Sequence, residues 1–326
     1  MEAVAWISAS KVLVYSFWYL LATLAFISCC RVNDKMTPNS PFEGGTGDVF
    51  CTLRRLTRHC LQYGRIKYCF LTLLLFVCSF LGKEQAVTFP LWMLLIYWLA
   101  GYSFKDRKVW FSVTPFLLLS LVFGIITILS QSISGSAFSG AGYPVWQRMV
   151  YACYTFAEYV LKSIVPFKLS YLYPFPSLPG DPLPSWLLIY PLLLAVLLLA
   201  FWRQLVTHKV WAFCLLFFGI HIAVALHIVS LSRFTVVADR YAYMATIGVC
   251  LLIAYYAVNF VQNSRKIQKA IFISGFAAYL LYFGIYANLR SRDWYDTDTL
   301  KKEVLDLRKE RENVTTTYNL LRHFHR

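Results

Sequence analysis

The sequence contains little charge for its length. Of its 326 residues, 14% are charged and 59% are hydrophobic, whereas a soluble domain carries roughly 25% charged residues. These side chains are too few to cover a soluble fold of this size, and the chain is too hydrophobic to be disordered. We therefore expect an all-α, polytopic membrane protein. Helices are expected because an open strand would leave backbone polar groups without partners in lipid.

The chain also lacks the motifs of soluble enzymes. It has no glycine-rich phosphate loop, no HExxH and no GxSxG sequence. Its nine cysteines include no CxxC pair and no Cys/His cluster with metal-ligand spacing. We interpret them as small apolar residues and expect no disulfide framework, no metal and no cofactor.

Acidic residues are scarce as well. The chain has 16 of them and 31 Lys and Arg residues, which gives a net charge of +15. In a soluble protein this excess would indicate nucleic acid as a partner. In a membrane protein it is first a topology signal and a contact with anionic lipids. We therefore expect membrane lipids and no nucleic acid among the partners.

Apolar segments at eight places predict membrane-spanning helices. They are residues 12–30, 68–82, 86–101, 109–130, 186–202, 210–230, 242–261 and 270–287. Together they predict a transmembrane helical bundle over residues 1–289, with an extracytoplasmic helical tail over 290–326. Several reach the roughly 20 residues that a helix needs to cross the hydrocarbon core.

The connections between these segments alternate in basic content. Connection 31–67 holds seven Lys and Arg residues, and connections 102–108 and 262–269 hold three each. The 55-residue connection 131–185 also holds only three. Basic connections face the cytoplasm, so both termini and the loop 131–185 are predicted outside. We expect a multi-pass protein of the bacterial inner membrane rather than of the endoplasmic reticulum.

The long outer loop has two distinct parts. Residues 143–164 have apolar side chains near helical spacing and predict an interfacial helix. Residues 166–185 contain six prolines and predict an aromatic-rich loop on the membrane surface. This loop is either a passive connection or a wall of a binding cleft.

Few charged residues fall on the predicted outer side. Lys83, Arg233 and Arg240 could bind the phosphate of a lipid-linked substrate, Arg as a planar fork and Lys as a point charge. The alternative is local salt bridging or snorkelling of these side chains. Carboxylates that could act as a general base include Glu2 and Glu84. Residues that could line the acceptor side are Tyr171, Tyr173, Asp239 and Tyr241.

Five elements, in order, resemble the transmembrane-and-tetratricopeptide-repeat family of GT-C-like, protein O-mannosyltransferase-like membrane glycosyltransferases. They are MEAVAWISASKVLVYSFWYLLATLAF (1–26), GKEQAVTFPLWMLL (82–95), PFKLSYLYPFP (166–176), VADRYAYMATIGVCLL (237–252) and RSRDWYDTDTL (290–300). Together they cover nearly the whole chain. The resemblance implies transfer of a mannose-like sugar from a polyprenyl-phosphate donor to a protein or glycan acceptor outside the cytoplasm.

Family members carry charged residues at the positions of Glu2, Lys83, Glu84 and Arg240. They also begin about two spans earlier, with an acidic outer loop that holds the usual catalytic base, and they end in tetratricopeptide repeats. This chain shows neither region, so we expect it to bind the donor without turning it over on its own. The alternatives are a non-catalytic binder or flippase-type carrier of polyprenyl-linked sugars, and a structural membrane protein.

Overall fold

The computed structural model describes residues 10–31, 65–133, 143–166, 169, 173, 175–177, 180–228 and 235–292. Within this part the chain is helical, apart from one isolated antiparallel bridge between Tyr173 and Val237. The all-α prediction is therefore confirmed for these residues. The expectations for Glu2, Tyr171, Arg233 and the tail beyond residue 292 lie outside the described residues.

The helices run in the following order. They are α2 (Ser10–Arg31), α4 (Arg65–Gly82), η2 (Glu84–Thr88), α5 (Phe89–Leu99), α6 (Arg107–Ile133), α7 (Val145–Ile164), η3 (Ser185–Leu188), α8 (Ile189–Thr207), α9 (Lys209–Ile222), η4 (Ala223–Ala225), η5 (Asp239–Ala242), α10 (Thr246–Asn263) and α11 (Lys266–Arg292). The interfacial helix predicted at 143–164 is present as α7.

Five of the helical segments are long and apolar enough to cross a membrane. They are Ser10–Cys30, Arg107–Ser130, Ser185–Thr207, Thr246–Asn263 and Lys266–Arg292. The last three bury almost none of their side chains inside the protein. Apolar surface on this scale is stable against lipid but not against water. The described helices are thus compatible with a multi-pass membrane protein.

Of the other three predicted spans, 68–82 is present as α4, and the remaining two are shorter than expected. Residues 84–88 form a 3-10 turn, so the segment predicted at 86–101 contains an α-helix of only 11 residues, α5. Pro90 lies in the first turn of α5, where no N–H partner is needed. The segment predicted at 210–230 is helical only to Ala225, and His227 has a φ of 58°. A right-handed helix cannot continue through that conformation.

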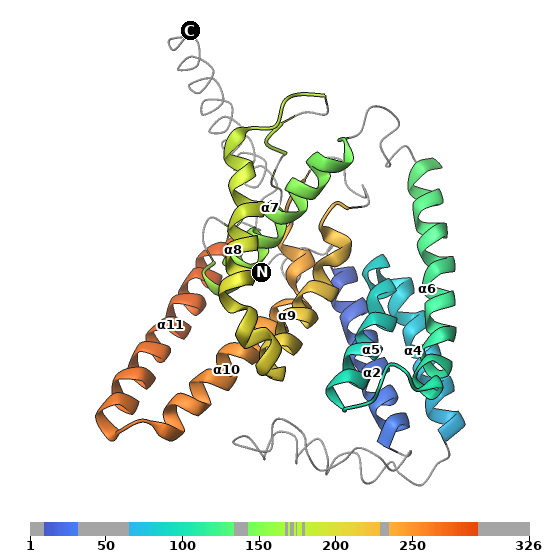
Figure 1. Ribbon diagram of the computed structural model, residues 1–326, viewed down its shortest axis with the longest axis horizontal. Helices are drawn as coiled ribbons and strands as arrows, with labels where there is room; N and C mark the ends of the chain where they lie inside the picture. The colour runs from blue at the N-terminus through green and yellow to red at the C-terminus, as the bar shows by residue number, and fades with distance from the viewer. Residues whose placement is uncertain are drawn as a thin grey trace.

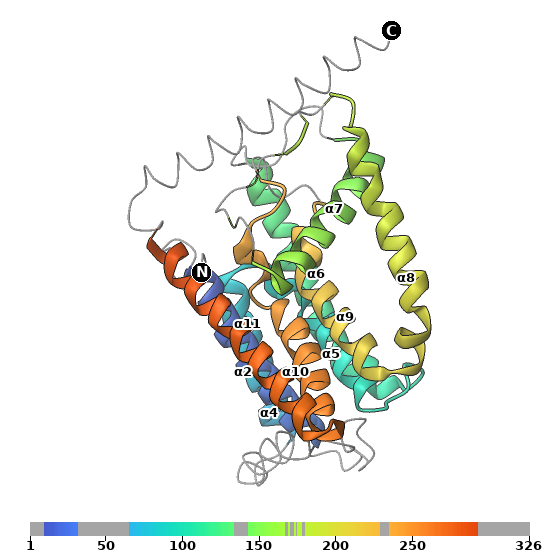
Figure 2. The same ribbon diagram turned by 90° about the vertical axis from the view of Figure 1, so that its left-hand side faces the viewer.

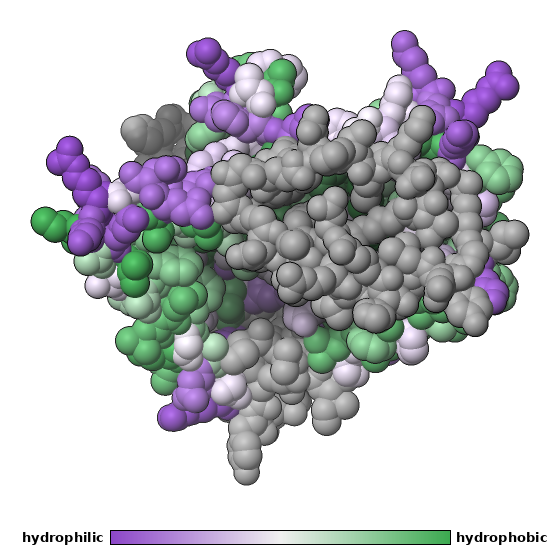
Figure 3. All heavy atoms as spheres, turned by 90° about the horizontal axis from the view of Figure 1, so that it is seen from below, coloured by the Kyte–Doolittle hydropathy of each residue, from purple (hydrophilic) through white to green (hydrophobic). Residues whose placement is uncertain are grey.

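The helices run up and down between two ends of the molecule. Figures 1 and 2 both place the α5–α6, α8–α9 and α10–α11 connections at the lower end, with the end of α2 and the start of α4. These connections are the basic ones in the sequence. Figure 3 looks at this end, and hydrophilic side chains project around its rim while the flanks are largely hydrophobic. The upper end carries the turn 82–85, helix α7 and the segment 235–242.

Two buried clusters form the core, and α9 contributes to both. The first joins α2, α4, α5 and α6, and α9 adds Phe213 and Phe217 to it. The second joins α7, Tyr173 and the segment before α10, and α9 adds Phe218 and Ile222. Helix α9 therefore connects the two halves of the molecule. Because it fixes their relative positions, it brings the turn after α4 close to the turn before α10.

Candidate functional site

The base of the site is the extended segment 235–238, which α7 holds in place. The phenol of Tyr159 donates to the carbonyl of Ala238 at 3.1 Å and accepts from its N–H at 2.9 Å. The hydroxyl of Thr155 donates to the carbonyl of Val236 at 3.3 Å. Buried backbone groups need such partners, and here side chains of α7 supply them. The next residues, Asp239–Ala242, are thereby held at a fixed distance from α7.

Tyr173 joins the same segment from the proline-rich loop. Its carbonyl accepts from the N–H of Val236 at 2.8 Å, and its own N–H donates to the hydroxyl of Thr235 at 3.2 Å. Its phenol donates to a carboxylate oxygen of Asp239 at 3.4 Å. The loop is therefore packed against this segment at Tyr173.

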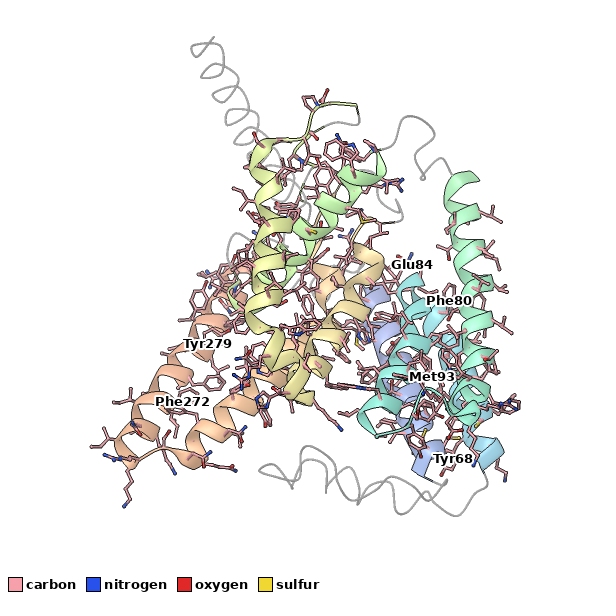
Figure 4. The ribbon with its side chains drawn as sticks, viewed as in Figure 1. Tyr68, Phe80, Glu84, Met93, Phe272 and Tyr279 are labelled. Carbon is pink, nitrogen blue, oxygen red and sulfur yellow. The ribbon has the colours of Figure 1, made fainter. Side chains whose placement is uncertain are left out.

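The turn between α4 and α5 forms the opposite side. Gln85 is buried and donates to the carbonyl of Tyr241 at 3.5 Å. This contact brings Lys83 and Glu84 next to the residues that precede α10. Figure 4 shows Glu84 at the upper end of the α4–α5 pair, far from Tyr68 at the other end of α4.

Basic side chains gather around two tyrosine rings. The ammonium of Lys83 lies 4.2 Å from the ring centre of Tyr241, and the guanidinium of Arg240 lies 5.2 Å from the same centre. Lys162 of α7 lies 3.6 Å from the ring centre of Tyr173. The negative face of an aromatic ring attracts a cation at such distances. Tyr241 therefore has two cations near its ring, one from the turn after α4 and one from the residue that precedes it in the chain.

The site is not uniformly positive. Glu158 lies 3.6 Å from Lys162, and Asp239 accepts the hydrogen bond from Tyr173. Positive charge is thus balanced near Tyr173, and Lys83 and Arg240 form the basic part beside Tyr241. Within the described ranges, no group of three or more His, Cys, Asp or Glu side chains could hold a metal ion.

His227 supports the base of the site from the other side. Its ring Nε2 lies 2.9 Å from the carbonyl of Val236, which can only accept, so this nitrogen carries the hydrogen. Burial lowers the pKa of His227, and the bond to Val236 opposes this shift in part. The imidazole is therefore held as a neutral hydrogen-bond donor near neutral pH.

Six of the residues predicted from sequence come together here from three segments of the chain. They are Lys83, Glu84, Tyr173, Asp239, Arg240 and Tyr241. Glu2, Tyr171 and Arg233 fall outside the described residues, so their predicted roles stay predictions.

The residues that hold the site together were not predicted from the sequence. Tyr151, Thr155 and Tyr159 recur every four residues on α7 and are fully buried, and Glu158 and Lys162 follow the same spacing. Hydroxyl groups at this spacing on an amphipathic helix could have indicated a buried polar face. No sequence pattern indicated Gln85, because its hydrogen-bond partner is the backbone carbonyl of Tyr241, which is far away in the chain.

The structure thus defines a class: an all-helical protein with long apolar helices and a polar, aromatic site at one end. Comparison of the chain with protein-family models, with curated proteins and with solved structures finds no match. The function must therefore be argued from the site and from the resemblance of the sequence elements that build it.

Proposed function

We propose that this protein is the membrane domain of a GT-C-type glycosyltransferase. It binds the polyprenyl-phosphate donor from which the enzyme transfers a mannose-like sugar to a protein or glycan acceptor outside the cytoplasm, and we expect no turnover by this chain alone. The observation that carries this proposal is the meeting of Lys83 and Arg240 at the ring of Tyr241. Both cations belong to sequence elements that resemble charged motifs of that family.

The donor consists of a polyprenyl chain and a phosphate, which require different surroundings. Its polyprenyl chain requires lipid, which the exposed apolar flanks of α8 and α11 face. Its phosphate requires cations at the end of the lipid-facing helices. Arg240 offers a planar fork of N–H donors, and Lys83 adds a compact point charge. The phosphate therefore binds at Tyr241, with its polyprenyl chain in the bilayer.

The sugar and the acceptor lie on the side of Tyr173. A carboxylate in this region activates the acceptor hydroxyl, and it must come within about 2.6–3.2 Å of the proton that it removes. Asp239 is held by Tyr173, and Glu84 lies next to Lys83. These two are the proposed bases among the described residues, while Glu2, Tyr171 and Arg233 complete the site as predicted from sequence.

The proposal includes an orientation. The shorter helices α4, α5 and α9 also cross the membrane, which gives eight crossings with the site on the outer side. The support is that the basic connections gather at the end opposite to the site, and positive connections remain in the cytoplasm. The membrane is then the bacterial inner membrane.

The test compares two arginines at opposite ends of the molecule. Arg240→Ala removes a proposed phosphate contact, whereas Arg203→Ala removes a basic residue of α8 near its lower end. A charge-assisted hydrogen bond is worth about 1.5–3 kcal/mol, so Arg240→Ala should weaken binding of polyprenyl phosphate by roughly one to two decades. Arg203→Ala should leave it within about twofold. Equal effects of the two substitutions would contradict the proposed donor site.

A second candidate function is a non-catalytic carrier of polyprenyl-linked sugars. It is favoured by the fact that Asp239 and Glu158 are already engaged by Tyr173 and Lys162. The two functions differ in the role of the carboxylates. Sugar transfer that is lost in Asp239→Asn or Glu84→Gln, with donor binding retained, supports the enzyme. Because we expect no turnover by this chain alone, the assay supplies the family's acidic outer-loop region; donor binding without transfer under that condition supports the carrier.

A further inference from the structure

We propose that Cys29 and Cys69 form a dithiol site, which an external disulfide of the glutathione class oxidises to an intramolecular disulfide between α2 and α4. The two sulfur atoms lie 2.9 Å apart, and neither cysteine is part of a disulfide. The cysteines are 40 positions apart and belong to no CxxC motif. Only the packing of the two helices brings them together.

The register of α2 against α4 supports the position of Cys29 in their interface, independently of the distance between the sulfur atoms. At the upper end, the hydroxyl of Ser79 donates to the carbonyl of Tyr15 at 3.0 Å. Gly82 lies so close that an added Cβ would be 2.9 Å from the backbone nitrogen of Tyr15. Cys29 lies fourteen residues further along α2 than Tyr15, which is about four helical turns, so it stays on the side of α2 that faces α4. Cys69 lies three residues before the buried Thr72 of α4, and the packing of the two helices brings it to Cys29.

Small side chains let the two helices approach closely along this interface. Ala22 and Ala25 of α2 and Thr72 of α4 are all buried, with 0%, 7% and 1% of their surface exposed. Small residues at a helix interface bring the backbones together. A disulfide needs a Cα–Cα distance of roughly 4.4–6.8 Å, which tightly packed helices can reach.

The two thiols differ in access, as a dithiol exchange site requires. Cys69 is exposed and Cys29 is buried. Both line a small pocket of about 30 Å³, together with Cys30, Thr72 and Tyr97. A small reagent can therefore reach Cys69 first. This pocket lies at the other end of α2 and α4 from the candidate functional site.

The exchange proceeds in two steps. The thiolate of Cys69 attacks one sulfur of the external disulfide, which forms a mixed disulfide and releases one glutathione thiolate. The thiolate of Cys29 then attacks the sulfur of Cys69 and releases the second glutathione thiolate. Two protein thiols are oxidised, one external disulfide is reduced to two thiols, and the protons of the protein thiols pass to the released thiolates.

The position of the dithiol site in the molecule determines when the disulfide forms. Tyr68, adjacent to Cys69, lies at the lower end of α4 in Figure 4, the end with the basic connections. Under the proposed orientation this end faces a reducing compartment, where protein thiols remain reduced. The disulfide then forms only when the glutathione pool becomes oxidised. The pairing itself does not depend on the proposed glycosyltransferase function.

The test uses the full chain in detergent with a protease site inserted within residues 36–50. The protein is treated with oxidised glutathione, alkylated, denatured, cleaved and separated on a non-reducing gel. The two fragments should remain linked in the unmodified protein and in the matched controls Cys30→Ser and Cys78→Ser. The linked fraction should fall at least tenfold in Cys29→Ser and in Cys69→Ser.

Reduced glutathione should separate the fragments again. Linkage that persists in Cys69→Ser, linkage that disappears in Cys30→Ser, or fragments that never become linked would each overturn the proposal. Unchanged donor binding in Cys29→Ser, together with loss of linkage, would show that the dithiol site and the donor site are independent.

Discussion

The phenol oxygen of Tyr159 makes two hydrogen bonds to a single residue, Ala238, as donor to its carbonyl and as acceptor from its N–H. This one side chain satisfies both backbone groups of a residue that is fully buried. Asp239, Arg240 and Tyr241 follow directly. The position of the functional side chains therefore depends on a hydroxyl that binds the residue before them.

Tyr159→Phe should test this dependence. The substitution keeps the ring but leaves the buried N–H and carbonyl of Ala238 without their partner, at about 1–3 kcal/mol for each orphaned group. We expect a lower Tm in detergent and weaker binding of polyprenyl phosphate. Tyr255→Phe on α10 is the control and should change neither quantity measurably. Donor binding by Tyr159→Phe equal to that of the unmodified protein would separate the site from this contact.

Gly82→Ala should destabilise the α2–α4 pair. The added Cβ would lie 2.9 Å from a backbone nitrogen and 3.0 Å from the Cα of Tyr15, so the helices must separate. We expect a loss of about 1–3 kcal/mol from overpacking, measured by thermal or denaturant unfolding. Gly275→Ala in α11 meets no atom within 4 Å and should be neutral or slightly stabilising, since Ala favours a helix over Gly. Similar losses for both substitutions would contradict the close approach at Gly82.

His227 predicts a pH dependence of stability. Its pKa in the folded protein is lowered from the usual 6.5 by burial, so the unfolded chain takes up a proton at higher pH than the folded one. Above pH 6.5 both forms are neutral and the residue has no effect. As the pH falls below 6.5, the free energy of unfolding should decrease until the pKa of the folded state is passed.

The measurement is the Tm in detergent as the pH is lowered from about 7.5 to 5. His227→Asn should give a flatter dependence, because Asn does not titrate, can donate a hydrogen bond and tolerates the left-handed backbone at this position. An equally steep loss in His227→Asn would assign the dependence to other groups.

The orientation in the membrane can be tested by cysteine labelling in a background without other reactive cysteines. Ser264→Cys lies between α10 and α11 at the basic end, and Asp181→Cys lies in the proline-rich loop at the other end. An impermeant maleimide added to intact cells should label position 181 and spare position 264. Labelling of position 264 alone would reverse the proposed orientation. Labelling of both positions would contradict it.

Much of the architecture was predictable from local sequence. Helical structure at the five long apolar segments follows from hydropathy alone, because a chain in lipid must satisfy its backbone internally. The amphipathic spacing of residues 143–164 likewise predicted α7. The ends of α5 and α9 were predicted less well. A 3-10 turn at Glu84–Thr88 and the left-handed backbone at His227 arise from packing, and apolar composition does not reveal them.

The residue types of the site were also visible in the sequence, but their association was not. Lys83 and Arg240 stood out because charges are scarce on the predicted outer side. Arg240 is the neighbour of Tyr241 in the chain, but only the packing of the two halves on α9 brings Lys83 to the same ring. The pairing of Cys29 with Cys69 likewise depends on the register of α2 against α4. Hydropathy is a sum over neighbours in the chain, whereas these contacts depend on how distant helices pack, which no local pattern contains.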